Sequence, residues 1–319
     1  MIDKNSGIKR FVCYKLSSEY DEMGQYDLIS FCGIDCKKCT NYKQNMNCQG
    51  CRDERELLSD CPTRICANEK GLVHCGDCEV FPCEELINFY HDGKASHLQA
   101  YKNIIKYSVR LRLEEEKDYK ITENVTREAF WNLFIPACDE HLLLYTMRKE
   151  PDFIKELDFV ATIGDEIVGN IAYAKAKVID GAVEHEALTF GPVCVLPKYQ
   201  GMGIGGMLIN HTITLAREMG YKAIFIYGDP EYYKRFGFEP SIKFKITNRE
   251  KRYPAALQAL ELLPSALKGV TGVFDEGKAY QIDNSHFDEY DKQFPFKEKF
   301  HTKTQDWFTD ISNRFYDEG

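Results

Sequence analysis

Long apolar runs are missing from this 319-residue sequence, and no stretch approaches the roughly 20 consecutive apolar residues that a membrane-spanning helix requires. The first 15 residues contain no apolar segment followed by a cleavage site. Internal repeats and low-complexity tracts are also absent, whereas 44% of the residues are hydrophobic and 13% aromatic. The sequence therefore predicts a folded, soluble, cytoplasmic protein that is long enough for two domains and does not enter a membrane.

Basic residues are in deficit, since 41 Lys and Arg stand against 50 Asp and Glu and give a formal net charge of -9. An excess of negative charge disfavours broad attraction to nucleic acid or to anionic lipid. Neutral or cationic partners fit this balance better. The sequence leaves the oligomeric state open.

Cysteine is scarce in most of the chain and dense in one segment, where ten of the 13 cysteines fall. This segment contains three C-x2-C pairs, a spacing that brings two thiolates to one tight turn, as a tetrahedral metal requires. The ten candidate metal ligands are Cys32, Cys36, Cys39, Cys48, Cys51, Cys61, Cys66, Cys75, Cys78 and Cys83.

Ten thiols exceed the needs of one site, and two four-cysteine zinc sites with two spare thiols are the simplest arrangement. An iron–sulfur cluster uses the same ligands, and a set of free or redox-active thiols is a third possibility. Seven Lys and Arg against eight Asp and Glu between Cys32 and Cys83 disfavour a nucleic-acid finger. We interpret the segment as a structural or protein-docking module.

The segment also resembles cysteine-rich domains of unknown function found in many anaerobic bacteria and archaea. The resemblance rests on C-G-x-x-C-x-x-C at Cys32, C-x-G-C at Cys48 and a final F-P-C at Cys83. Because no role is established for those domains, the resemblance implies no activity.

The change in cysteine content predicts a domain boundary. After Cys83, apolar residues recur at helical spacing, with a break near Asp92-Gly93, up to a charged run at 113–118 that we interpret as a linker. We predict an N-terminal extension over 1–26, a cysteine-rich domain with closing helices over 27–115, and a second domain over 117–319 whose C-terminal extension starts at about 248.

Helix-like and strand-like patterns alternate in the second domain. A helix is expected within 126–135, an antiparallel hairpin around Gly164-Asp165, and a third strand over 186–197 that Gly191-Pro192 interrupts. A helix over 207–219 and a buried strand over 221–228 follow. Residues 241–247 look like a further strand, 255–263 fit a strand or a short helix, and the aromatic, charged final segment shows no clear periodicity.

A glycine-rich loop separates the third strand from the next helix, where Gly201, Gly203 and Gly206 spell G-x-G-x-x-G. Glycine lets backbone N–H groups approach phosphate oxygens, with a helix N-terminus behind them. In a dinucleotide-binding fold the strand runs directly into the first glycine and more βαβ units follow, neither of which applies here. Asp229 nevertheless stands about where a ribose-binding acid is expected, which keeps a nicotinamide-dependent oxidoreductase open as an alternative.

A different phosphate loop fits better. Gln200, Gly203 and Gly205 match Gln/Arg-x-x-Gly-x-Gly/Ala shortly after a strand ending in V-x-P, and "YYKRFGF" at 232–238 resembles F-Y-x-K-x-G-F. With both motifs in order, the chain from Tyr119 onward resembles the GNAT superfamily of acyl-CoA-dependent N-acyltransferases. The resemblance implies an α+β fold with a mixed, mostly antiparallel twisted sheet and flanking helices, preceded here by a small cysteine-rich, metal-stabilised domain.

The resemblance also implies roles for individual residues. The backbone amides of the glycine loop would hold the pyrophosphate of acetyl-CoA, the strand before it would pair with the pantetheine arm, and Tyr233 would be the general acid that protonates the departing thiolate. The implied cofactor-binding residues are Val193, Cys194, Val195, Gln200, Gly201, Met202, Gly203, Ile204, Gly205 and Gly206. Cys194 itself is interpreted as a small core residue rather than a nucleophile.

An attacking ammonium must first lose a proton, so a base is also needed. Asp165, Glu184 and Glu186 are candidates, of which we favour Glu186, and a chain of waters is an alternative. We thus predict an enzyme that transfers acetyl from acetyl-CoA to a primary amine of a small molecule or protein, by direct attack in a ternary complex. The alternative is a non-catalytic CoA-binding sensor or adaptor with a metal- or redox-responsive cysteine-rich module.

Overall fold

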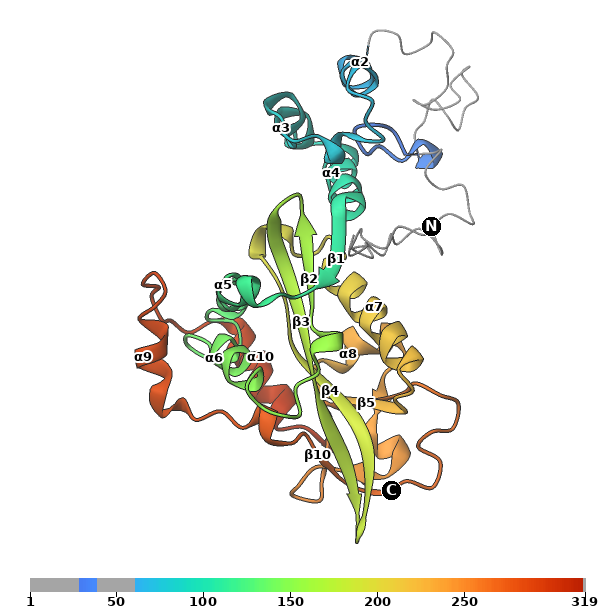
Figure 1. The fold of residues 1–319 in the computed structure, drawn as a ribbon, viewed down its shortest axis with the longest axis vertical. Coiled ribbons are helices and arrows are strands. Elements are labelled where there is room, and N and C mark those ends of the chain that lie inside the picture. The colour runs from blue at the N-terminus through green and yellow to red at the C-terminus, as the bar shows by residue number, and fades with distance from the viewer. Residues whose placement is uncertain (1–28, 39–60, 318–319) are drawn as a thin grey trace, which may run out of the picture. The chain divides into compact units, whose positions relative to one another are not determined.

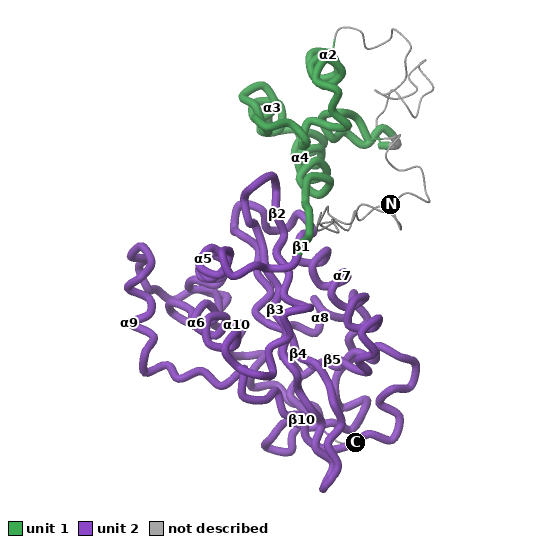
Figure 2. The backbone as a smooth tube through the Cα atoms, in the orientation of Figure 1, with its two compact units in different colours: residues 1–112 green, residues 113–319 purple. Residues whose placement is uncertain are grey.

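A computed structural model describes residues 29–38 and 61–317 of the chain. The chain divides into two compact units, residues 1–112 and residues 113–319 (Figure 2). Among the helices in the described ranges, not one combines the length and the apolar character that crossing a bilayer takes.

The first unit is helical around a small apolar core. Its elements are the short 3-10 helices Cys36–Lys38 and Cys75–Asp77 and the helices α2 (Pro62–Glu69), α3 (Glu84–Tyr90) and α4 (Ala95–Ser108), and β1 (Val109–Leu113) follows α4. Helices on both sides of Asp92-Gly93 are as predicted, and Gly93 has a φ of 88° that suits the break. The core side chains are Phe31, Ala67, Cys75, Leu86, Tyr90 and Ala100.

Helix α4 holds the loop that begins at Cys32. Asn103 Nδ2 donates to the Gly33 carbonyl at 2.8 Å, and the Tyr90 hydroxyl of α3 donates to the Cys32 carbonyl at 2.9 Å. Gly33 has a φ of 94°, and a Cβ there would lie 2.2 Å from the Ala100 carbonyl oxygen. Glycine in the C-G-x-x-C motif is therefore required by packing against α4 as well as by backbone conformation.

The second unit is built on a mixed sheet in the strand order β2-β3-β4-β5-β9-β6. Only the β4–β5 pair is parallel among these, so the predicted mostly antiparallel sheet is confirmed. A later strand, β10, pairs antiparallel with β3 and parallel with β7. The bounds are β2 (Phe159–Ile163), β3 (Glu166–Asp180), β4 (Val183–Val195), β5 (Ala223–Tyr227), β6 (Glu239–Pro240), β7 (Ile246–Thr247), β9 (Leu257–Glu261) and β10 (Gly272–Asp275), with β8 (Tyr253–Pro254) and β11 (Phe315–Tyr316) forming a separate pair.

Helices cover both faces of this sheet. Helices α5 (Tyr119–Phe130) and α6 (Glu140–Met147) lie on one side, and α7 (Ile204–Glu218) lies on the other (Figure 1). Because side chains alternate between the faces of a strand, Tyr173 points to α7, where its hydroxyl lies 2.9 Å from Thr212 Oγ1. Its neighbour Ala174 faces the other way and packs with Leu144 and Met147 of α6.

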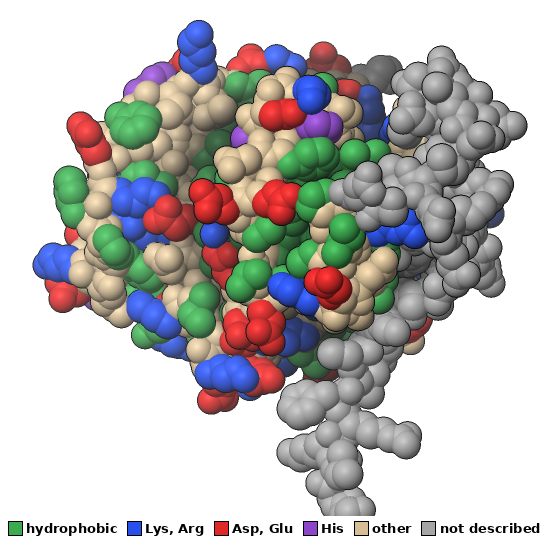
Figure 3. Space-filling model, turned by 90° about the horizontal axis from the view of Figure 1, so that it is seen from above, with side chains coloured by type: hydrophobic (Ala, Val, Ile, Leu, Met, Phe, Trp, Pro, Cys, Tyr) green, Lys and Arg blue, Asp and Glu red, His purple; other side chains and the backbone are tan. Residues whose placement is uncertain are grey.

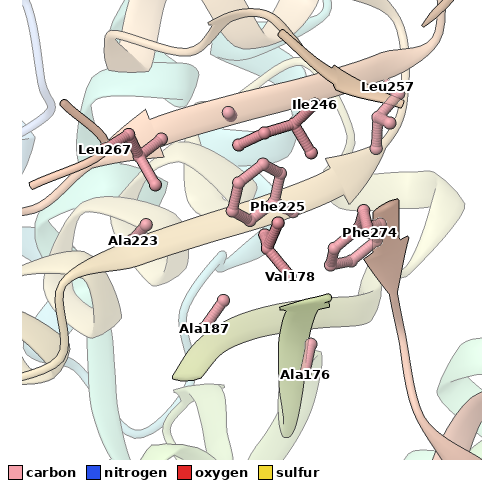
Figure 4. Close-up of a cluster of buried hydrophobic side chains, with 10 residues drawn as sticks. Ala176, Val178, Ala187, Ala223, Phe225, Ile246, Leu257, Leu267 and Phe274 are labelled. Atoms are coloured by element: carbon pink, nitrogen blue, oxygen red, sulfur yellow. The ribbon is translucent and has the colours of Figure 1, made fainter. Parts of the chain in front are cut away.

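A second apolar cluster lies toward the far end of β3, on the same face as Ala174. Phe225 of β5 and Phe274 of β10 point toward each other and stack with ring centroids 4.9 Å apart (Figure 4). Val178 and Ala187 pack beside them, from β3 and β4. This cluster fixes β10, which comes late in the chain, against the centre of the sheet.

The predicted linker over 113–118 starts where the two units divide, between residues 112 and 113, and its Glu114 side chain is fully buried and pairs with Arg148 at 2.7 Å. Two expectations need correction. The strand expected over 241–247 is a 3-10 helix, Ser241–Phe244, followed by the two-residue β7, because Lys245 adopts a left-handed φ of 56° and turns the chain. The final segment contains two helices without a predicted counterpart, α9 (Phe287–Asp291) and α10 (Lys303–Ser312).

Candidate active site

The sheet opens where β4 runs past β5. The two parallel strands pair only at Leu188↔Ile224 and Thr189↔Phe225, whereas β4 continues to Val195 alongside β3. The β3–β4 register shifts opposite Gly191 and Pro192, as expected for a proline that cannot donate to a ladder. Within residues 29–38 and 61–317, the last part of β4 therefore has a neighbouring strand on one side only.

On the side of β4 away from β3, the described residues provide no partner strand for its last backbone groups. The Leu196 N–H donates to Val168 O at 2.8 Å, so alternation turns the peptide groups of Val193 and Val195 away from β3. Gln200 Nε2 donates to the Val195 carbonyl at 3.0 Å, which leaves Val193 facing the open side. The Cys194 side chain is buried, and burial raises the pKa of its thiol to about 11, so the sulfur stays protonated.

The predicted glycine loop leads directly into α7. Gly201 and Gly203 have φ values of 73° and 89°, and no atom lies within 4 Å of the position that a Cβ would take at either residue. Gly203 is the N-cap of α7 and makes no side-chain cap, and the first N–H groups of a helix have no acceptor within the helix itself. The buried side chain of Ile204 anchors this turn in the core. The loop thus presents backbone donors to open space.

Two contacts fix the loop on either side. Tyr199 directly precedes Gln200, and its hydroxyl donates to Glu166 Oε2 at 2.8 Å. On the other side, a Cβ at Gly205 would lie 3.4 Å from the Tyr232 hydroxyl, and a Cβ at Gly206 would lie 3.6 Å from the Phe236 ring. The two motifs, about 30 residues apart in sequence, are therefore in contact.

Tyr233 ends the short helix α8 (Pro230–Tyr233) and lies beside the opening of the sheet. Its ring rests against Gly228, where a Cβ would be 2.3 Å from Tyr233 Cε2, and its centroid is 6.0 Å from that of Phe190 on β4. The hydroxyl makes no hydrogen bond to residues 29–38 or 61–317, and burial raises its pKa. The site therefore holds a protonated phenol that is free to donate.

Asp229 is the N-cap residue of the short helix α8. Its carboxylate accepts from the Glu231 N–H at 2.9 Å and caps α8. The strand beyond β5 is the antiparallel β9, so no further parallel βαβ unit follows. Both findings contradict the nicotinamide-dependent oxidoreductase.

The candidate bases lie away from Tyr233. Glu186 is exposed on β4 and acts electrostatically on Tyr221, whose pKa is raised chiefly by burial. It precedes Phe190 by four residues, about 13 Å along an extended strand. Glu184 pairs with Lys177 at 2.6 Å, and Asp165 occupies an exposed turn. The described geometry does not bring any of these carboxylates to the phenol.

Seven of the ten predicted metal ligands lie in the described residues, and Cys39, Cys48 and Cys51 lie outside them. Across the described ranges, no three Cys, His, Asp or Glu side chains gather closely enough to hold a metal ion. Lys70 Nζ lies 3.5 Å from Cys78 Sγ. Burial, together with the nearby Cys32 and Cys83, raises the pKa of Cys75 to about 12.

Sequence analysis missed three residues around the opening. The Tyr280 hydroxyl donates to the Gly191 carbonyl at 2.8 Å, and the carboxylate of Glu276 acts electrostatically on Tyr280. Arg235 stacks over the Tyr232 ring at 3.8 Å, close to the glycine loop. The "YYKRFGF" motif could have indicated Arg235, whereas nothing in the final segment marked Glu276 or Tyr280.

Comparisons with known proteins match both parts of the chain. Residues 156–240 match the family model "Acetyltransferase (GNAT) domain", and residues 28–88 match "Protein of unknown function (DUF3795)". The uncharacterized N-acetyltransferase YhbS of Escherichia coli K12 is 30% identical over 137 residues, which cover 43% of this chain and 80% of YhbS. The uncharacterized N-acetyltransferase YjhQ of the same strain is 36% identical over 102 residues, 31% of this chain and 51% of YjhQ, so the chain spans about half of that relative.

Part of the chain also matches solved structures of acetyltransferases. YhbS of Escherichia coli in complex with CoA is 25% identical, with a TM-score of 0.49 and coverage of 54% of this chain and 92% of that one. A GNAT family acetyltransferase of Brucella melitensis in complex with acetyl-CoA is 26% identical, with a TM-score of 0.44 and coverage of 54% and 98%.

The fold and the loop define a class: a mostly antiparallel sheet with one parallel β4–α7–β5 unit, whose glycine loop lies beside an opening between the two parallel strands. Together with the relationship to YhbS, this identifies the family. The chain belongs to the GNAT family of N-acetyltransferases.

Proposed function

We propose that this protein transfers acetyl from acetyl-CoA to a primary amine, by direct attack of the amine within a ternary complex. The observation that carries the proposal is the glycine loop at the N-terminus of α7, with its left-handed glycines and unobstructed backbone donors. The relationship to YhbS, which has been crystallised with CoA, supports the choice of ligand.

The residues present fit acetyl-CoA. The amides from Gly201 to Gly206 would receive the pyrophosphate, since no side chain caps them, and Arg235 would add positive charge nearby. The free peptide groups of Val193 would bind the amide-containing arm in the way an added strand binds a sheet edge. When bound, acetyl-CoA supplies an activated acetyl thioester.

Tyr233 is the proposed acid. As the new N–C bond forms and the C–S bond breaks, the phenol gives its proton to the leaving thiolate. A buried phenol without a protein acceptor retains that proton at neutral pH, which supports the assignment. The preferred base of the sequence analysis, Glu186, stays a prediction for which the contacts described above offer no support.

The cysteine-rich segment is proposed to bind zinc, with an iron–sulfur cluster as the alternative. The support is its C-x2-C spacing, a property of the ten cysteines as a set. A cytoplasmic location and a small-molecule or protein amine as acceptor remain predictions alongside it.

Calorimetry with acetyl-CoA tests the proposed function. Gly203→Ala should weaken binding at least tenfold, because it places a Cβ among the loop amides and strains a left-handed residue. Gly220→Ala is the matched control, since Gly220 has nearly the same φ, 87°, and equally open surroundings at the other end of α7, and it should change binding less than twofold. A wild-type protein that binds no acetyl-CoA refutes the proposal, and one that binds it but acetylates no amine is a sensor.

A further inference from the structure

Tyr280 belongs to a segment that crosses one face of the sheet. Phe274 of β10, at the start of this segment, stacks on Phe225 of β5 (Figure 4). Six residues later, Tyr280 packs against the apolar cluster that includes Leu144 of α6 and Ala174 of β3. The Tyr280 ring therefore lies on the α6 face of the sheet, opposite α7.

The Tyr280 hydroxyl reaches β4 at the point where this strand is irregular. It donates to the Gly191 carbonyl at 2.8 Å. Gly191 and Pro192 together stand opposite the single residue Ala172 of β3, which is the arrangement of a β-bulge. A bulge interrupts the regular ladder, and proline brings no N–H to it. Tyr280 thus supplies a side-chain donor to the backbone at this irregular point.

Tyr280 and Tyr233 contact this part of β4 from opposite faces. Phe190, the residue before Gly191, faces α7, and its ring centroid lies 6.0 Å from that of Tyr233. The two hydroxyls differ in their partners, since Tyr280 donates to Gly191 whereas Tyr233 has no acceptor among the described residues. The proton of Tyr280 is engaged by the backbone, which suits a residue that positions the strand rather than one that transfers a proton.

The residues before Tyr280 fix its position. Asp275 accepts from Arg249 Nη2 at 2.6 Å and from the Gly277 N–H at 3.0 Å. Gly277 packs closely on β3, where a Cβ would come within 3.2 Å of the Lys175 carbonyl oxygen. These contacts tie the segment to the sheet before it reaches Tyr280, so the hydroxyl is a fixed donor for the bulge.

The orientation of the Gly191 carbonyl constrains the next peptide group. The ring of Pro192 holds its φ at about −65°, so one free rotation, the ψ of Pro192, separates the Gly191 carbonyl from the Val193 N–H. We propose that Tyr280 is a positioning residue for acetyl transfer: by holding the Gly191 carbonyl, it keeps the Val193 N–H directed at the acyl-bearing arm of acetyl-CoA. This inference rests on the proposed function and deepens it with a residue that lies outside both sequence motifs.

Tyr280→Phe tests the inference, because it keeps the ring and removes the donor. Acetyl-CoA should bind roughly two- to tenfold more weakly, the range for one lost hydrogen bond, and kcat should fall roughly tenfold because the thioester is misplaced. The pH profile of kcat should stay as in wild type, since Tyr280 transfers no proton. Tyr145→Phe, an exposed tyrosine of α6, is the control and should alter none of these quantities. An unchanged kcat or a shifted pH profile in Tyr280→Phe would overturn the inference.

Amide NMR spectra of the free protein, labelled with nitrogen-15 valine, give a readout that does not depend on turnover. The Val193 N–H signal should shift or broaden in Tyr280→Phe, while the signal of Val160 on β2 stays in place. A Val193 signal identical to that of the wild type would contradict the inference. Failure of the wild type to bind acetyl-CoA in calorimetry would instead count against the proposed function and leave this comparison intact.

Discussion

The residues packed around Tyr233 determine the protonation state of its hydroxyl group. Gly228 leaves room for the ring, Phe190 and Phe238 flank it at centroid distances of 6.0 and 5.7 Å, and the described residues leave its hydroxyl without a partner. Burial disfavours the phenolate and so keeps the proton available. Packing, rather than a neighbouring charge, therefore sets the protonation state of this group.

Tyr233→Phe removes the proposed acid and little else. We expect kcat to fall roughly 100-fold, within the range typical of a lost general acid, with acetyl-CoA affinity within twofold of wild type. Steady-state kinetics and calorimetry measure the two quantities. Tyr232→Phe is the matched control at the neighbouring position and should retain kcat, whereas an unchanged kcat in Tyr233→Phe would remove the assignment.

Asp158 is a buried carboxyl group whose pKa is raised in the folded protein, whereas the pKa of a paired carboxylate is usually lowered. Burial and a hydrogen bond with Glu114 raise its pKa well above 3.8, and Asn170 Nδ2 donates to its Oδ1 at 3.0 Å. The folded chain thus keeps a proton that the unfolded chain loses near pH 3.8. The contribution of Asp158 to the free energy of unfolding is therefore fully present below pH 3.8 and decreases as the pH rises toward the pKa of Asp158 in the folded protein.

Asp158→Asn should therefore raise the free energy of unfolding at pH 8 more than at pH 5, since the amide preserves hydrogen bonding and never ionises. Urea denaturation at the two pH values measures the difference. Asp165→Asn, in an exposed turn, should leave the pH dependence as in wild type. A variant that is less stable than wild type at both pH values would show that the carboxyl is ionised in the fold.

At the scale of elements, α9 is joined to α5 and α6 through one carboxylate. Asp291 accepts from Arg127 Nε at 2.6 Å and Nη2 at 3.0 Å, and from His141 Nε2 at 3.0 Å. Burial lowers the pKa of His141 to about 4, so the ring is neutral and its Nδ1 accepts from the Cys138 thiol at 3.5 Å. Three segments far apart in sequence thus meet at Asp291.

Asp291→Ala should cost about 3–5 kcal/mol of unfolding free energy, because it leaves the fully buried Arg127 guanidinium without its counter-ion. Asp288→Ala provides the control, since Asp288 is 87% exposed in its ion pair with Lys299, and it should cost less than about 1 kcal/mol. Chemical denaturation followed by circular dichroism measures both. Equal costs would mean that Arg127 finds another partner.

The same scale shows what the sequence could and could not predict. The glycine loop and the hairpin at Gly164-Asp165 follow from local patterns, because each depends on turn residues along the chain. Helix α9 lacks such a pattern and is held by Asp291 through contacts with residues about 150 positions away. Tyr280 was missed for the same reason, since the pairing of β10 with β3 and the contact with Gly191 bring it to the opening.

At the scale of the whole molecule, the two units are built around different cores. The second is organised by a central sheet, and the first by a few apolar side chains around Tyr90. Acidic and basic side chains are interspersed over the face shown in Figure 3, where no broad basic area gathers outside the part covered in grey. This distribution on the visible face agrees with the acidic net charge of -9.

Removal of metal should destabilise the first unit, because all ten predicted ligands lie within residues 1–112. If the cysteine-rich segment binds zinc or an iron–sulfur cluster, treatment of the full chain with a chelator should lower the melting temperature of that segment by several degrees and leave acetyl-CoA affinity within twofold. Elemental analysis of protein purified without oxygen, calorimetry and differential scanning calorimetry give the three readouts. Protein that contains no metal when so purified would refute the metal site.

The chain after β10 brings Tyr280 to the opening of the sheet and, eleven residues later, Asp291 to the buried Arg127. One stretch of chain, 280–291, therefore holds both the edge of the opening and the buried guanidinium of Arg127. A deletion within this stretch would be expected to disturb both contacts at once, so that a local change would be felt on two sides of the domain.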